Sequence, residues 1–129
     1  MQIELCIVAS AAILGLLQIV MVVVAGLPQR GLKWDMGPRD DAKPLSGVAA
    51  RIERASINFF ETFPVFVAVV LVAYLAGKLG DLTQLGAVLY LAGRILYVPL
   101  YAFGIPVVRT VAWSVALLGI VLVLIAIAQ

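Results

Sequence analysis

Four long apolar stretches separated by shorter polar ones define the pattern of this 129-residue chain. A helix that rises 1.5 Å per residue needs about 20 residues to cross a hydrocarbon core of about 30 Å. The pattern therefore predicts membrane-spanning helices over residues 3–26, 46–76, 82–103 and 108–128. The first stretch has no preceding Lys or Arg and is longer than a signal-peptide core of about 7–15 residues. We therefore expect a retained helix rather than a cleaved signal.

The polar connections predict how these helices follow one another. Residues 27–47 form a loop rich in Pro, Gly and charge, in which Trp34 is placed to anchor at the headgroup level. Residues 77–81 form a short turn, and Gly104-Ile105-Pro106 forms another, so consecutive helices are expected to be antiparallel neighbours. The fold class expected for residues 1–129 is a single all-α domain, a four-helix transmembrane bundle.

Composition supports a membrane protein and excludes several other classes. The chain is 64% hydrophobic, against about 45–50% for a soluble domain. A net charge of +2 is too small to suggest nucleic acid as a partner. The chain has one cysteine, Cys6, and no histidine, so we expect neither an internal disulfide nor an imidazole metal site.

The basic residues predict the orientation in the membrane. Most of them belong to the first loop or follow the third connection, as Arg109 does, whereas the opposite side carries only Lys78. The positive-inside rule then places loops 1 and 3 in the cytoplasm and both termini outside. We expect a multi-pass protein, and its compact form favours a bacterial inner membrane.

A row of polar residues opens the second helix. Arg51, Arg54, Asn58 and Glu61 are spaced three, four and three apart, so they share one helical stripe, while Glu53 points the other way. A charge at membrane depth costs roughly 2.5–3.5 kcal/mol on insertion scales and usually faces a partner or a wet cavity. The row therefore predicts the floor of a polar ligand site.

The third helix carries a second row, Tyr90, Arg94, Tyr97 and Tyr101, again on one face. Both rows begin at the same side of the membrane, with Arg109 at the rim. A surplus of arginines over carboxylates implies an anionic ligand. A small zwitterion with two carboxylates and one amine, such as glutathione, fits this set of groups. An arginine aimed at its sulfur would favour the nucleophilic thiolate.

The same charges also allow a different interpretation. Arg54 and Glu61, or Arg94 and Glu61, can form a structural ion pair that locks two helices together. The protein would then be a non-catalytic membrane protein that uses this fold for lipid binding or assembly.

Two motifs resemble those of a known family. Arg54-x-x-x-Asn58-x-x-Glu61-x-x-Pro64, preceded by Arg51, resembles the helix 2 signature of the MAPEG family, the membrane-associated proteins in eicosanoid and glutathione metabolism. Arg94-x-x-Tyr97-x-x-x-Tyr101 resembles the helix 3 pattern of its leukotriene-forming and glutathione-transferase members. The likeness covers the whole chain.

The resemblance implies a homotrimer with glutathione bound between subunits, acting as a transferase or peroxidase on hydrophobic electrophiles from the bilayer. It also implies roles for individual residues. The residues that would bind glutathione are Arg54, Asn58, Glu61, Tyr97 and Tyr101. Arg51 and Arg94 would line or brace the pocket, and Arg30 is a weaker match to a carboxylate-binding arginine. Arg109 would stabilise the thiolate. The chain departs from the family pattern at two places. Thr62 stands where the family often has a tyrosine, and the gap between Tyr101 and Arg109 is slightly longer than in the eicosanoid enzymes of the family.

Overall fold

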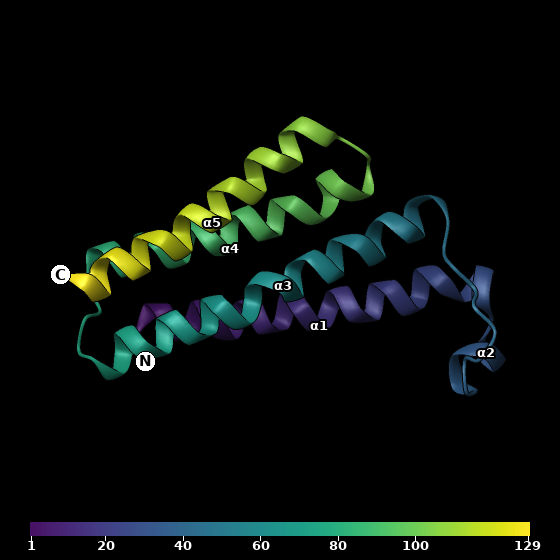
Figure 1. Cartoon of the computed structure of the whole chain (residues 1–129), viewed down its shortest axis with the longest axis horizontal. Coiled ribbons are helices and arrows are strands. Elements are labelled where there is room, and N and C mark those ends of the chain that lie inside the picture. Colours follow the sequence, from purple (N-terminus) through teal and green to yellow (C-terminus); the bar gives the residue numbers. More distant parts are fainter.

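The structure, a computed structural model, describes residues 1–129 and consists of helices and their connections (Figure 1). The helices are α1 (Ile3–Arg30), α2 (Leu32–Met36), α3 (Gly47–Leu75), α4 (Asp81–Ala102) and α5 (Pro106–Ala128). All but α2 are long and apolar enough to cross a membrane. The predicted all-α class and the four long helices are therefore confirmed.

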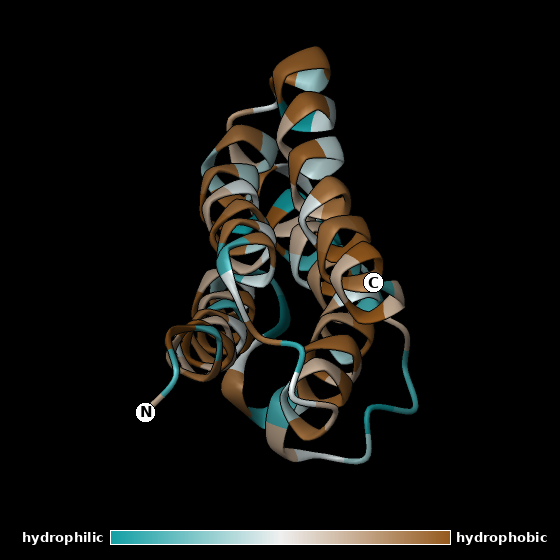
Figure 2. Cartoon of the chain, turned by 90° about the vertical axis from the view of Figure 1, so that its left-hand side faces the viewer, coloured by the Kyte–Doolittle hydropathy of each residue, from teal (hydrophilic) through white to brown (hydrophobic).

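The four long helices form two antiparallel pairs, α1 with α3 and α4 with α5 (Figure 1). Large side chains such as Phe59, Phe66, Tyr90 and Val123 fill the space between the helices. Hydrophobic residues make up most of the long helices (Figure 2), and many of their large side chains, among them Leu16, Leu75 and Val107, are exposed. An outer surface of this kind suits hydrocarbon rather than water.

The first helix and the first loop differ from their predicted form. α1 continues through Pro28 to Arg30 instead of ending at residue 26. It stops at Gly31, whose positive φ of 83° and N–H bond to the Leu27 carbonyl end the last turn. The loop then holds the short helix α2, which sequence analysis did not predict. α3 runs through Pro64 without ending.

Glycines bring α4 and α5 into close backbone contact. A Cβ atom built on Gly86 would lie 2.5 Å from the Gly119 carbonyl oxygen, and one built on Gly93 would lie 2.7 Å from the Ala112 carbonyl oxygen. Small residues allow helices in membranes to pack this closely. The seam of Gly86, Gly93 and Gly119 fixes the register between α4 and α5, and so sets which residues of the two helices meet.

Candidate functional site

A cavity of about 350 Å³ opens between α3, α4 and α5, near the end of the bundle that carries the first loop. Its lining is mostly polar or aromatic. The nine residues are Arg54, Ile57, Asn58, Glu61, Tyr97, Tyr101, Arg109, Thr110 and Trp113. Six of these were predicted site residues, so the two polar rows do meet in space.

Helical spacing places the α3 side of the cavity. Arg54, Asn58 and Glu61 lie on one face of α3, and two turns, about 10 Å, separate the first from the last. Behind them, Ala55 and Phe59 are fully buried and hold this face in place. One face of α3 thus presents a cation, an amide and an anion in order of depth.

α4 and α5 supply the opposite wall. Tyr97 and Tyr101 lie one turn apart on α4, with ring centroids separated by 5.5 Å. α5 begins with Pro106, and Arg109 in its first turn reaches the cavity despite the longer connection. The turn is made possible by Gly104, whose φ is 71°.

Tyr101 lies between two guanidinium groups. Arg54 donates a hydrogen bond from Nε to the Tyr101 hydroxyl at 3.0 Å. The guanidinium carbon of Arg109 lies 4.2 Å from the centre of the same ring. The Tyr101 ring attracts a cation, but an uncharged ring does not neutralise the positive charges of Arg54 and Arg109. Two arginines at the mouth of one cavity therefore favour an anion between or beside them.

Glu61 has no cationic partner in the chain. The only ion pair joins Arg30 to Glu53, on the other side of α3. The structural pairs considered for Glu61, with Arg54 or with Arg94, are not formed. Glu61 is exposed and lines the cavity. Its carboxylate is thus free to accept hydrogen bonds from a bound ammonium group.

Arg94 lies behind the cavity rather than in it. The side chain is only 1% exposed, and its Nη1 donates to Asn58 Oδ1 at 2.9 Å. Its guanidinium carbon is 4.5 Å from the centre of the Tyr97 ring and 5.5 Å from that of Phe59. Because Asn58 Oδ1 accepts this bond, the Asn58 NH₂ group remains as a donor for the cavity. Arg94 thereby orients the amide.

Arg51 and Tyr90 also lie outside the cavity. Arg51 Nη1 donates to the Ala102 carbonyl at 3.5 Å, and the residue lines a smaller hollow of about 190 Å³ that shares Arg54 and Arg109 with the cavity. Tyr90 is fully buried, stacks on Phe66 and shares a hydrogen bond of 3.1 Å with Thr62. Thr62 therefore serves the core.

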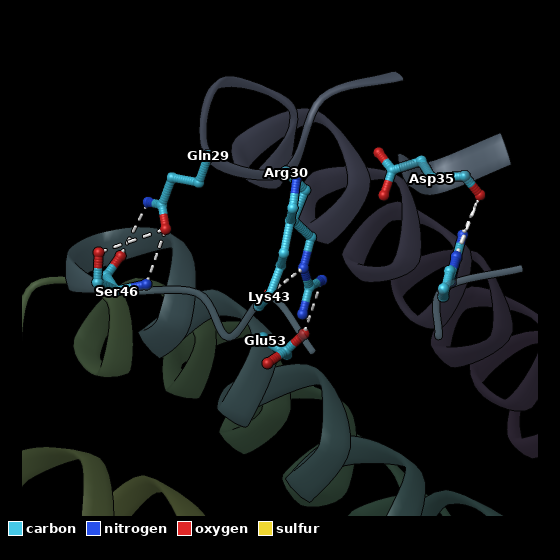
Figure 3. A network of polar contacts seen from close by, with 7 residues as sticks. Gln29, Arg30, Asp35, Lys43, Ser46 and Glu53 are labelled. Atoms are coloured by element: carbon cyan, nitrogen blue, oxygen red, sulfur yellow. Dashed lines mark hydrogen bonds and ion pairs between the residues drawn. The ribbon is translucent and has the colours of Figure 1, made fainter. Parts of the chain in front are cut away.

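Arg30, a predicted site residue, contacts the first loop and Glu53 rather than the other predicted site residues. It donates from Nε to the Lys43 carbonyl at 2.8 Å and pairs with Glu53 at 3.2 Å (Figure 3). These bonds tie the first loop to α3. Within one chain, Arg30 does not line the cavity.

Three lining residues were not singled out from the sequence as site residues: Ile57, Thr110 and Trp113. Trp113 follows Arg109 by four positions, so the helical repeat would have placed it beside Arg109. Thr110 is the next residue after Arg109, and the repeat gives no such signal for it. Ile57 and Glu61 also border an apolar groove of about 460 Å³ formed with Ile19, Ser56 and Phe60. The polar cavity and the apolar groove are thus neighbours.

Comparison with known proteins identifies the family of the chain. A search of curated proteins gave no match. The sequence model of the MAPEG family matches residues 7–129, which is nearly the whole chain. With its four long apolar helices and the family match over almost its full length, the chain belongs to the MAPEG family.

Proposed function

We propose that the protein is a membrane-bound, glutathione-dependent transferase or peroxidase that acts on hydrophobic electrophiles. Membership of the MAPEG family suggests a glutathione-related transferase or a related function. The observation that carries the proposal is the cavity that gathers Arg54, Asn58, Glu61, Tyr97, Tyr101 and Arg109.

The charges of the cavity suit glutathione. Two guanidiniums and one carboxylate line it, and glutathione brings two carboxylates and one ammonium. Arginines bind carboxylates through paired hydrogen bonds, while Glu61 receives the ammonium. Asn58 donates to a peptide carbonyl or a carboxylate. A volume of about 350 Å³ lies at the lower end of the range of ligand pockets, about 300–1,000 Å³, as expected for a tripeptide.

Arg109 is the residue that we assign to the thiol. A thiol with a pKa near 8.5 is mostly protonated at neutral pH, and a neighbouring guanidinium lowers that pKa. Arg109 also stands in the first turn of α5, where the helix dipole favours negative charge. The thiol proton leaves to solvent, and the sulfur attacks an electrophilic carbon to form a C–S bond while the leaving group departs with its electron pair.

The apolar groove gives the second substrate a place. It adjoins the cavity at Ile57 and Glu61, and Ile57 is 55% exposed on the outer surface. A lipophilic electrophile that diffuses in the bilayer can therefore reach the sulfur from the side. In peroxidase turnover, the same thiolate would attack the O–O bond of a lipid hydroperoxide, which would release the alcohol and leave the sulfenic acid of glutathione. A second glutathione thiol would then convert the sulfenic acid to the disulfide and water.

Assembly as a homotrimer is part of the proposal. The cavity also opens on the surface of α5, where Thr110 is exposed, and a second copy can cover that side. The α1–α3 and α4–α5 connections lie at the same end of the bundle (Figure 1). With that end in the cytoplasm, the cavity would face the compartment that supplies glutathione.

Binding of glutathione is the first test. Isothermal titration of the detergent-purified protein with glutathione should give saturable binding below the millimolar range. Arg54→Ala should weaken this binding about tenfold or more, since it removes a charge-assisted pair worth about 1.5–3 kcal/mol. Arg39→Ala removes an arginine from the first loop and should leave binding unchanged. No heat of binding at millimolar glutathione would remove the central claim.

Arg94 should affect binding through Asn58. Arg94→Met and Asn58→Leu should each weaken glutathione binding, and the double variant should be little worse than either single one. Residues that share one hydrogen bond show coupling energies of about 0.5–3 kcal/mol. The measurement is a double-mutant cycle of glutathione dissociation constants. Fully additive losses would show that Arg94 acts independently of the amide.

A non-catalytic role in lipid binding or assembly is the alternative function. Its premise was that Glu61 is neutralised by Arg54 or Arg94, and neither pair is formed. The geometry therefore favours a ligand site over a structural ion pair at Glu61.

A further inference from the structure

A second hollow lies in the first loop, apart from the cavity. Its volume is about 340 Å³, and it lies beside the end of α1. Four cationic side chains line it, from Arg30, Lys33, Arg39 and Lys43, together with the carboxylates of Asp40 and Asp41. Since Glu53 pairs with Arg30 at 3.2 Å, the hollow carries a surplus of one positive charge.

Trp34 forms the centre of this hollow. The guanidinium carbons of Arg30 and Arg39 lie 4.8 Å and 5.4 Å from its ring centre. The Trp34 indole nitrogen donates to the Asp41 carbonyl at 2.7 Å, and Arg39 donates to the Asp35 carbonyl at 2.8 Å. Arg39 is thus held by the loop, whereas Arg30 is held by the Lys43 carbonyl and by Glu53 of α3. By contrast, the ammonium groups of Lys33 and Lys43 have no hydrogen-bond or ion-pair partner in the chain.

The depth of the hollow matches the boundary between hydrocarbon and water. α1 has 28 residues and is about 42 Å long. This length exceeds the hydrocarbon thickness of about 30 Å, so an end of α1 lies at headgroup level. Trp is the residue type that is enriched at this level.

α2 adds an apolar side to the same region. Leu32 and Met36 are one turn apart on α2, and they are 64% and 79% exposed. Of the other helices, α2 packs only against α1, on the side of the bundle away from α4 and α5 (Figure 1). Two exposed apolar side chains therefore accompany a cationic hollow at the membrane surface.

We propose that the hollow of Arg30, Lys33, Trp34, Arg39 and Lys43 binds the phosphate of an anionic glycerophospholipid. Lys33 and Lys43 supply the free ammonium groups for the phosphate. Leu32 and Met36 contact the acyl chains. A zwitterionic lipid brings no net charge to offset the surplus, so the hollow selects a net anionic headgroup. This site does not depend on glutathione or on the proposed activity.

Native mass spectrometry of the delipidated protein in detergent tests the proposal, with phosphatidylglycerol and phosphatidylcholine as probes. The wild type should prefer phosphatidylglycerol. Lys33→Gln and Lys43→Gln should each reduce this preference about fivefold, since one basic residue near an anionic surface contributes about that factor. Lys78→Gln, in the turn between α3 and α4, should change the preference less than about twofold. Lys33→Arg, which keeps the charge, should retain it.

Fluorescence locates the lipid independently. The chain has two tryptophans, so Trp34 is the sole emitter in the Trp113→Phe variant. Phosphatidylglycerol with brominated acyl chains should quench this emission more than brominated phosphatidylcholine at the same concentration. Equal quenching by both lipids, or equal losses from Lys33→Gln and Lys78→Gln, would overturn the proposal. Displacement of the lipid by an equal concentration of soluble glycerol phosphate would also overturn it, since the hollow would then recognise phosphate alone.

Discussion

Replacing Arg109 by alanine is expected to abolish formation of the glutathione thiolate while leaving glutathione bound. The guanidinium lines the cavity in the first turn of α5, whereas the other arginine of the cavity, Arg54, stays in place on α3. Loss of one preorganised donor to a developing anion typically costs about 10²–10³ in rate. The rate of conjugation to a chlorinated dinitrobenzene should fall by that factor, with the dissociation constant of glutathione changed less than about tenfold.

The thiolate itself provides the direct measurement for Arg109. Ultraviolet difference absorbance on addition of glutathione reports the thiolate, and S-methylglutathione, which has no thiol, gives the baseline. Arg109→Lys should retain part of the signal because it keeps a cation near the sulfur. Arg39→Ala serves as the matched arginine control. A thiolate signal that persists unchanged in Arg109→Ala would exclude the assigned role.

Replacing Gly119 by leucine should have the largest effect on stability. A Cβ at this position would lie 2.7 Å from the backbone nitrogen of Tyr90, an atom that cannot move away without a shift of α4. Overpacking typically costs about 1–3 kcal/mol, and a clash with backbone lies at the upper end of that range or above it. We expect a lower unfolding temperature, followed by circular dichroism in detergent, and weakened glutathione binding.

Gly80→Leu is the control for that substitution. Nothing lies within 4 Å of a Cβ built on Gly80, and its φ of −177° is extended backbone that any residue adopts. Its unfolding temperature should stay close to that of the wild type. An equally stable Gly119→Leu variant would show that α4 and α5 do not depend on the glycine seam.

Sequence reasoning predicted the helices and the faces they present. The spacing of Arg54, Asn58 and Glu61 fixed one stripe of α3, and the cavity contains all three residues. Tyr97 and Tyr101 follow the same logic on α4. The spacing of residues predicts which face of a helix a side chain lies on, and a long apolar stretch predicts a membrane-spanning helix. Both can be read from the sequence because both depend only on nearby residues of the chain.

Contacts between helices were harder to predict. Tyr90 shares its stripe with Tyr97, yet it meets Thr62 and Phe66 in the core because the neighbouring helix, not the repeat, determines what lies opposite. Arg30 pairs with Glu53 because the first loop folds back on α3, a path that no local pattern encodes. The same long loop hides α2, whose five residues are too few for a recognisable periodic pattern.

The cavity draws its walls from both helix pairs. Arg54, Asn58 and Glu61 belong to the pair of α1 and α3, while Tyr97, Tyr101 and Arg109 belong to the pair closed by the glycine seam. Hydrogen bonds between α3 and α4 cross this joint, namely Arg54–Tyr101, Arg94–Asn58, Thr62–Tyr90 and Arg51–Ala102. If one helix pair slides or rotates against the other, the distance between the two walls of the cavity changes. The packing between the two pairs therefore determines the width of the site that a ligand enters.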